Sequence, residues 1–295
     1  MEPDIFPKTV RDAFAASLIF SFYPLTFQPL DGLCCKQFKS KGGSSMFSDA
    51  QLAAMIFSAV ISLGLPVGLL VLWWKKTGAH LRSAAVGAAM FFLFALVLEQ
   101  LLHLLALRPG GFILSHTWAY VLYGTLAAGV FEETGRLTGF RLLRRQDRRE
   151  SAVMYGIGHG GLESLLLGGI PAVWNLASAL GYNAGTLTGD ALASVPAALA
   201  APAADYLVIG VERALVICFH IALSVPVFQA AKRPGKRWLY PAAILLHAGM
   251  DVFAALYQRG VLSIWLSEGL MAACSVPACA LAFRLYRGDR TAESA

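Results

Sequence analysis

The sequence predicts an all-α, polytopic transmembrane helical bundle with about seven membrane-spanning helices. Its 295 residues are 57% hydrophobic and only 14% charged, and its mean hydropathy is +0.61. A soluble domain carries about 25% charged residues, so this composition excludes an ordinary soluble fold. A membrane-spanning helix needs about 20 mostly apolar residues. Seven segments meet this requirement, at 50–74, 84–107, 115–137, 152–180, 204–230, 238–257 and 261–283.

The segments differ in polarity, and the connections between them differ in length. The first, second and seventh are almost pure hydrocarbon, whereas the third to the sixth carry ionisable residues. Residues 141–150, "RLLRRQDRRE", are expected to extend the third helix as an amphipathic segment at the lipid headgroups. The connection at 181–205 is expected to form a flexible lid or a partly interfacial helix. No internal repeat is evident, which disfavours transporter designs built from inverted repeats.

Basic residues between the segments predict the orientation of the bundle. Sixteen of them follow the first, third, fifth and seventh segments, whereas the opposite loops hold only Arg108 and Arg259. Because cytoplasmic loops are enriched in Lys and Arg, the N-terminus is predicted to lie outside and the C-terminus in the cytoplasm. The net charge of +6 therefore reflects loops beside anionic lipid, and no nucleic-acid partner is expected.

The first 45 residues fit this topology poorly, because they place basic residues on the side predicted to lie outside. Met46 opens "MFSDAQLAAMIFSAV", a natural start to the first span. We therefore expect residues 1–45 to be an extension from an upstream start or a disordered leader, or else a short interfacial helix. Residues 46–285 are expected to form the membrane domain and residues 286–295 a cytoplasmic tail.

Four of the predicted spans carry ionisable residues in apolar surroundings. These residues are Glu132, Glu133 and Arg136 in the third, His159 and Glu163 in the fourth, Glu212, Arg213 and His220 in the fifth, and His247 and Asp251 in the sixth. Charges inside a bilayer are costly, so such residues are candidates for function. Residues four apart share a helix face, which predicts that His159 and Glu163 point one way, as do His247 and Asp251. Arg136 can hold one of the two adjacent glutamates ionised and leave the other free.

Depth within the bilayer groups the same residues. At about 1.5 Å per residue, the histidines and the glutamate pair lie roughly 10–15 Å below the cytoplasmic surface. We therefore expect them to converge on one hydrated, cytoplasm-facing cavity. The glycines of "GIGHGGLE" around His159 would let neighbouring helices, or a substrate backbone, come close.

Such a cavity suits hydrolysis by either of two chemistries. A carboxylate with an imidazole can take a proton from water, and a second imidazole, with Asp251 fixing its tautomer, can stabilise an oxyanion. Alternatively, His159, Glu163, His220 and His247 are candidate ligands of Zn²⁺. The HExxH motif of zinc proteases is absent. Whether a metal is bound stays open at this point.

Four motifs carry a resemblance to a known family. They are "EETGR" (132–136), "GHGGLE" (158–163), "FH" (219–220) and "HAGMD" (247–251). In their order and spacing, over residues 46–285, the chain resembles the YhfC family of intramembrane metalloproteases. This family belongs with the CAAX-type prenyl proteases and PrsW-like proteins in a glutamic-type membrane protease superfamily. The resemblance implies a bacterial cytoplasmic-membrane protein whose helical bundle hydrolyses peptide bonds in a cytoplasm-facing cavity.

The resemblance also implies roles for individual residues. Glu132 or Glu133 with His159 would activate water, and His247 with Asp251 would hold the oxyanion or help bind a metal. The chain departs from the prenyl proteases in having two residues between the second glutamate and Arg136, where they have three. It departs again in ending the last motif with Asp251, where they usually have Asn. The first departure leaves the catalytic glutamate open, and the second favours metal ligation.

The leading hypothesis is an intramembrane peptidase acting on a peptide or membrane-protein substrate within the lipid bilayer. Its expected catalytic residues are Glu132, Glu133, Arg136, His159, His247 and Asp251. One rival is a proton-coupled transporter, for which Glu99 and His103, four residues apart in the second span, provide a hint. Another rival is a non-catalytic scaffold that binds other membrane proteins.

Overall fold

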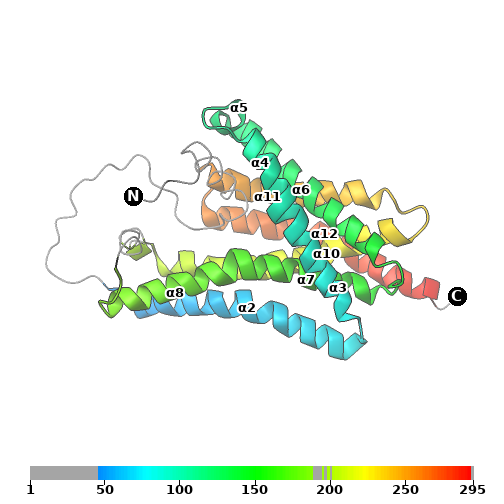
Figure 1. The fold of residues 1–295 in the computed structure, drawn as a ribbon, viewed down its shortest axis with the longest axis horizontal. Helices are drawn as coiled ribbons and strands as arrows, with labels where there is room; N and C mark the ends of the chain where they lie inside the picture. The colour runs from blue at the N-terminus through cyan, green and yellow to red at the C-terminus, as the bar shows by residue number, and fades with distance from the viewer. Residues whose placement is uncertain (1–45, 189–194, 196–197, 200, 294–295) are drawn as a thin grey trace, which may run out of the picture.

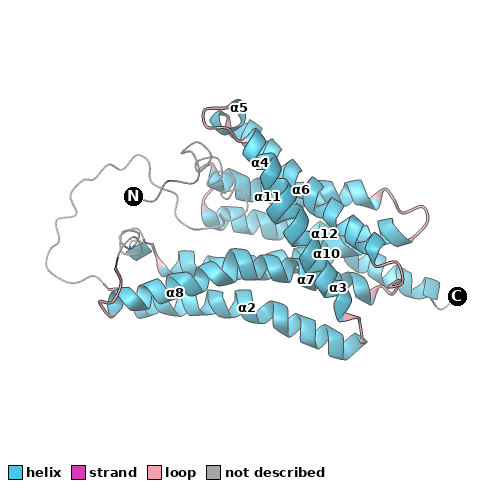
Figure 2. Cartoon of the chain, viewed as in Figure 1, coloured by secondary structure: helices cyan, strands magenta, loops and turns pink. Residues whose placement is uncertain are grey.

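The computed structural model describes residues 46–188, 195, 198–199 and 201–293. This part of the chain is helical and contains no strand (Figure 2). The expectations for residues 1–45 lie outside the described residues. The helices, in chain order, are α2 (Asp49–Thr77), α3 (Leu81–Phe91), η1 (Phe92–Glu99), α4 (Gln100–Ala106), α5 (Phe112–Ser115), α6 (Thr117–Leu142), α7 (Glu150–Glu163), η2 (Ser164–Gly169), α8 (Ile170–Asn183), α10 (Ala203–Lys232), α11 (Leu239–Gln258) and α12 (Ile264–Glu293).

The architecture is an all-α bundle of membrane-spanning helices, as the composition predicts. Among the described residues, 6 continuous helical rods are long and apolar enough to cross a membrane. They are α2, the rod of α3 with η1 and α4, the rod of α7 with η2 and α8, α10, α11 and most of α12. Helix α6, the third predicted span, is 26 residues long. It holds Glu132, Glu133, Arg136 and Arg141 and is therefore less apolar than these six rods. It nevertheless packs inside the bundle, against α11, η1, α10 and α3.

Two of the rods contain π-helical segments, η1 and η2, which sequence patterning does not predict. A π segment widens the helix by one residue per turn and is frequently found at functional sites. Glu99 is the last residue of η1, and Glu163 immediately precedes η2. Both segments therefore change the helix register beside an ionisable residue of the interior.

The expected helical extension over residues 141–150 is wrong. Helix α6 ends at Leu142, and the chain then turns into α7, which begins at Glu150. The reason is packing: Leu143 is buried in the core, and Ser83 of α3 hydrogen-bonds Gln146 of the turn. A helix continuing along the headgroups would remove both contacts.

The basic connections gather at one end of the bundle, where the C-terminus also lies (Figure 1). Arg233, which follows α10, binds Asp289 of α12 through Nε and Nη2 (2.8 and 3.0 Å) and Asp147 of the α6–α7 turn through Nη1 (2.7 Å). Arg149 donates to the carbonyl of Tyr286 (3.1 Å) at the same end. By the positive-inside rule this end is cytoplasmic, which agrees with the predicted orientation.

The opposite end is organised around the start of α2. Ser48 and Gln51 form a capping box there. The Phe47 N–H donates to Asn183 Oδ1 (2.9 Å), and the Asn183 side-chain amide donates to the Phe47 carbonyl (3.0 Å). These two hydrogen bonds connect the start of α2 to the end of α8. The first described residues and the end of α8 therefore lie on the outer side.

Glycines in α7 allow the close helix packing that the sequence predicts. A Cβ added at Gly158 would overlap the carbonyl of Ala84 in α3, and one at Gly156 would lie 2.6 Å from Ile221 Cα in α10. Helix α7 is therefore held between α3 and α10 at backbone contact distance. This packing places His159, between these glycines, in the interior of the bundle.

Candidate active site

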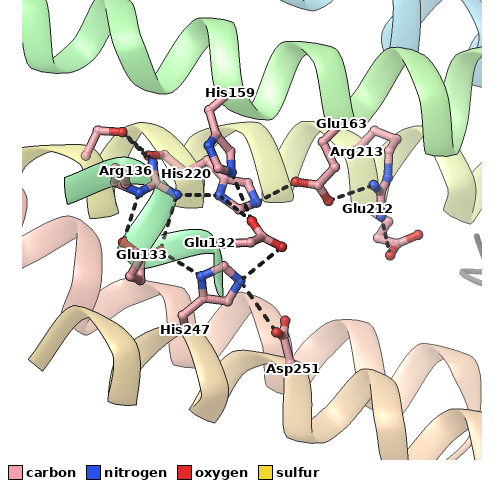
Figure 3. A network of polar contacts seen from close by, with 11 residues as sticks. Glu132, Glu133, Arg136, His159, Glu163, Glu212, Arg213, His220, His247 and Asp251 are labelled. Atoms are coloured by element: carbon pink, nitrogen blue, oxygen red, sulfur yellow. Dashed lines mark hydrogen bonds and ion pairs between the residues drawn. The ribbon is translucent and has the colours of Figure 1, made fainter. Parts of the chain in front are cut away.

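Ten ionisable residues from four helices form one connected network (Figure 3). The network unites the predicted residues of all four polar spans: Glu132, Glu133 and Arg136 of α6, His159 and Glu163 of α7, Glu212, Arg213 and His220 of α10, and His247 and Asp251 of α11. All of them except Asp251 are buried. The predicted convergence of distant segments on one site is therefore present in the structure.

Arg136 is fully enclosed, and all five of its N–H donors have acceptors. Its Nε and Nη2 bind the two carboxylate oxygens of Glu133 (2.9 and 3.3 Å). Its Nη1 donates to the His220 carbonyl (2.9 Å) and to Ser224 Oγ (2.6 Å), and Nη2 also donates to His220 Nδ1 (2.9 Å). Because a buried carboxylate with a bidentate arginine is compensated, Glu133 is the glutamate that Arg136 holds ionised.

The contact with Arg136 also fixes the tautomer of His220. A guanidinium can only donate, so His220 Nδ1 accepts, and the neutral ring then carries its proton on Nε2. His220 Nε2 lies 2.6 Å from Glu163 Oε2. The other Glu163 oxygen accepts from Arg213 Nη1 (3.2 Å), and Arg213 Nη2 binds Glu212 (2.6 Å). Glu212 and Arg213 thus form an ion pair, which orients Glu163.

His247 joins the network through both ring nitrogens. Its Nδ1 lies 2.7 Å from Glu133 Oε1, and because that carboxylate is paired with Arg136, Nδ1 carries the donated proton. Its Nε2 points between Asp251 Oδ2 (3.5 Å) and Glu132 Oε1 (3.9 Å). Glu133 therefore sets the orientation of the ring, and the predicted pairing of His247 with Asp251 is present.

Glu132 has different partners from its neighbour. Its Oε2 lies 2.9 Å from His159 Nε2, and 11% of its side chain is exposed, against 0% for Glu133. His159 packs edge-on against Phe91, and its Nδ1 is buried without a hydrogen-bond partner among the described residues. Since an unprotonated Nδ1 costs less there than an unpaired N–H, Nε2 is the donor and Glu132 accepts. Glu132, and not Glu133, faces open space.

That open space is a cavity of about 150 Å³ that begins at the network. Its acidic, basic and histidine lining residues are Glu99, Glu132, Glu163, Glu212, Arg213, His220, His247, Asp251 and Glu268. Phe91 and Phe219 line the cavity at the depth of the network. The other lining residues outside the network come from the outer halves of α6, α11 and α10, the outer part of the second rod, η2 and the first turns of α12.

The expectation of a cytoplasm-facing cavity is not met in the described part of the chain. On the cytoplasmic side of the network, the bundle is filled by Phe140, Tyr155, Leu223 and Phe228, each 0% exposed. Phe140 contacts Tyr155 (ring centroids 4.4 Å apart) and Phe228 (5.4 Å). Counting residues from the cytoplasmic ends of the spans gives the depth of the site in the bilayer. It does not show whether packed side chains lie on the cytoplasmic or on the outer side of the site.

Two acidic residues outside the network, Glu268 and Glu99, also line the cavity. Glu268 of α12 lines the cavity, and sequence reasoning missed it. The available signal was a single acidic residue within the otherwise apolar seventh span. Glu99 also lines the cavity and lies 3.3 Å from His103 Nε2, while His103 Nδ1 lies 2.8 Å from the Tyr123 hydroxyl.

Four of the buried residues form a group that can hold a metal ion. Glu132, His159, Glu163 and His220 each offer one donor atom, and these atoms lie within 4.8 Å of one another. Imidazole nitrogens and carboxylate oxygens are ligands that Zn²⁺ accepts, so the donor types fit a divalent ion. Three of the four predicted ligands belong to this group. The fourth, His247, is instead paired with Glu133 and Asp251.

Comparisons with known proteins agree with the motifs and the fold. A family model described as YhfC intramembrane metalloprotease matches residues 61–271. The uncharacterized membrane protein YhfC of Bacillus subtilis (strain 168) is 34% identical over 248 residues, which cover 78% of this chain and 96% of that protein. No solved structure matches the chain. The matched range contains every residue of the network and Glu268.

Proposed function

The chain belongs to the YhfC intramembrane metalloprotease family, and from this premise we propose that it hydrolyses a peptide bond of a membrane-associated substrate. The site supports such chemistry, because it joins carboxylates and imidazoles around a cavity inside a membrane bundle. We also propose that the protein resides in a bacterial cytoplasmic membrane, as its Bacillus relative and its basic inner loops suggest. The substrate would be a peptide or a membrane protein.

The single observation that carries the proposal is the unequal environment of the adjacent glutamates. Glu133 is neutralised by Arg136 and turned away from the cavity, whereas Glu132 reaches the cavity and accepts a hydrogen bond from His159. A general base must reach the water whose proton it takes. Glu132 is therefore the base, His159 orients it, and Glu133 is a positioning residue.

His247 serves the opposite side of the reaction. Glu133 holds its Nδ1–H, so Nε2 is directed into the cavity beside Asp251. When it is protonated at both nitrogens, a state that its position among Glu133, Asp251 and Glu132 favours, His247 can donate from Nε2–H to the developing oxyanion or pass that proton to the leaving amine. Asp251 keeps Nε2 aimed between itself and Glu132. These roles need no movement of the buried Arg136–Glu133 pair.

The metal-binding group falls within the same arrangement. Because Arg136 donates to His220 Nδ1, the proton of the neutral His220 ring stays on Nε2, 2.6 Å from Glu163, and His220 is not a ligand through that atom. The Nδ1 atom of His159 is free of hydrogen bonds to the described residues, so metal binding would move the His159 proton from Nε2 to Nδ1. Glu132, His159 and Glu163 would then be three ligands, with His220 and Arg213 beside Glu163. Three protein ligands and one open position are the pattern of catalytic zinc sites. A divalent ion held there, for example Zn²⁺, would supply Lewis acidity to the water beside Glu132.

The rival transporter function is disfavoured by one observation. A proton-coupled carrier needs polar groups across the whole bilayer, and Glu99, His103 and Tyr123 do extend the network outward. On the cytoplasmic side, however, the described interior is an apolar core. A polar path therefore ends at Arg136, as expected for a reaction site with one point of access.

The test compares Glu132→Gln with the wild type and with Glu150→Gln, an exchange in the first turn of α7 at the cytoplasmic end. The amide oxygen that Glu132→Gln introduces can still accept from His159, so the variant should fold, which its melting temperature in detergent will check. Membranes from cells expressing each protein are searched by mass spectrometry for newly formed peptide N-termini. We expect cleavage products with the wild type and Glu150→Gln, and a loss of about 10²–10⁴-fold with Glu132→Gln. Equal cleavage by a folded Glu132→Gln protein would reject the assignment.

A further inference from the structure

We infer that substrate reaches the catalytic residues from the non-cytoplasmic side, through a hydrated vestibule that opens between the outer ends of the helices. The vestibule is the part of the cavity lined by residues beyond the network, among them Glu99, Ala128, Ala254, Gln258 and Glu268. The inference rests on the proposed function for what the vestibule admits. Its geometry stands independently of that function.

The order of the lining residues along each helix gives the direction. Helix α6 runs inward, and its lining residues end at Glu132, the innermost of them. Helix α11 runs outward, and its lining residues begin at His247. Ala254 and Gln258 follow His247 by seven and eleven residues, or by about 10 Å and about 16 Å of helix axis. The lining residues of α12 belong to its first turns, beside the outer α11–α12 loop.

Among the acidic residues of α6 and α11, side-chain exposure rises in the same direction. Glu133 is 0% exposed, Glu132 is 11% exposed and Asp251, one turn farther out than His247, is 31% exposed. The helices follow the same trend: they lie close together at the cytoplasmic end and spread apart toward the outer end (Figure 1). Access through the cytoplasmic end would instead have to separate the packed rings of Phe140, Tyr155 and Phe228.

The charge of the vestibule requires water. Glu99 and Glu268 line it, and the network residues Glu212 and Asp251 line the adjoining part of the same cavity. Arg213 is the one Lys or Arg side chain of the whole cavity among the described residues. Carboxylates at bilayer depth are tolerated where they face a water-filled cavity, and not where they face lipid. The vestibule is therefore an aqueous pocket open to the outer side, and it also supplies the water that peptide hydrolysis consumes.

The test uses thiol labelling, which does not depend on catalysis. The five native cysteines are replaced by serine or alanine, and single cysteines are introduced as Ala254→Cys or Ala128→Cys in the vestibule. Arg144→Cys in the cytoplasmic turn reports on the inner side. A protein that keeps only Cys279, exposed on the surface of α12, reports on the membrane-facing side. Each protein is treated with a membrane-impermeant maleimide in intact spheroplasts and in inside-out vesicles.

We expect both vestibule cysteines to react at least ~10-fold faster in spheroplasts than in inside-out vesicles, because maleimide needs a solvated thiolate. Arg144→Cys should show the reverse preference, and the Cys279 protein should react slowly in both. Labelling of the vestibule cysteines only in inside-out vesicles would overturn the inference, and so would labelling in neither preparation. A protein that labels as expected but cleaves nothing would retain the vestibule and refute only the proposed function.

Discussion

At the scale of single residues, position along a helix decides the environments of two identical neighbours. Glu132 and Glu133 differ by one step on α6, and one step turns a side chain by about 100° around the helix axis. That rotation places Glu133 between Arg136 and His247, and Glu132 between His159 and the cavity. The sequence indicated that one glutamate would be held and the other free. It did not identify which, because the answer depends on where α7 and α11 lie around α6.

A residue-scale prediction concerns the metal-binding group. Wild-type protein purified in detergent should bind about one Zn²⁺ per chain. His159→Ala and Glu163→Gln should abolish binding, because each removes a proposed ligand. His220→Gln should retain binding with affinity weakened about 10–100-fold, as expected for a residue that supports a ligand. Elemental analysis after desalting gives the stoichiometry, and competition with a chromogenic chelator gives the affinities.

The control for this measurement is His116→Ala, which removes an exposed histidine outside the site and should bind zinc like the wild type. A wild-type protein that cleaves substrate while holding no metal would contradict the ligand set. Water activation would then fall to Glu132 and His159 alone.

At the scale of helices, hydropathy predicted all seven segments because the requirement for apolar length is a property of composition. The seven segments include α6, although its charged residues make it less apolar than the other six. The π segments η1 and η2 were not predicted, because widening a helical turn leaves its composition unchanged. The helix expected over 141–150 failed for a related reason: the amphipathic pattern was present, but Leu143 is buried in the core.

An element-scale prediction tests the contact between α3 and α7. Gly158→Ala should destabilise the protein by about 1–3 kcal/mol, because its Cβ would overlap the Ala84 backbone, which has no flexible end that can move away. The matched control is Gly64→Ala in the interior of α2, where an added Cβ meets nothing within 4 Å. That exchange should be neutral, or stabilising by about 0.5–1 kcal/mol through helix propensity. Thermal unfolding in detergent compares both with the wild type, and equal melting temperatures for the two variants would contradict the packing.

At the scale of the whole molecule, the bundle has a closed cytoplasmic end and an open outer end. The convergence of these residues on one candidate site was predictable, because ionisable side chains in apolar spans are few and their spacing places them on common faces. The side of the site on which the cavity lies was not predictable. It depends on whether side chains fill the space between the helices on the cytoplasmic or on the outer side of the site. Phe140, Tyr155 and Phe228 lie in three different helices, and their mutual contact appears only when those helices are assembled.

We expect the stability of the closed cytoplasmic end to depend on Arg233, which links the α6–α7 turn, the end of α10 and the end of α12. Hydrogen bonds to Asp289 and Asp147 raise the pKa of Arg233 further above its ordinary value, so its charge persists throughout the physiological pH range. Arg233→Ala would leave Asp289, which is 5% exposed, without its bidentate partner. We expect a loss of about 2 kcal/mol, the scale of a hydrogen bond between charged groups. Arg237→Ala, which removes an exposed charge of the same loop, should leave the melting temperature unchanged. If both variants melt like the wild type at low and at high salt, the three segments are held by the apolar core alone, and the tie through Arg233 contributes nothing to closing this end.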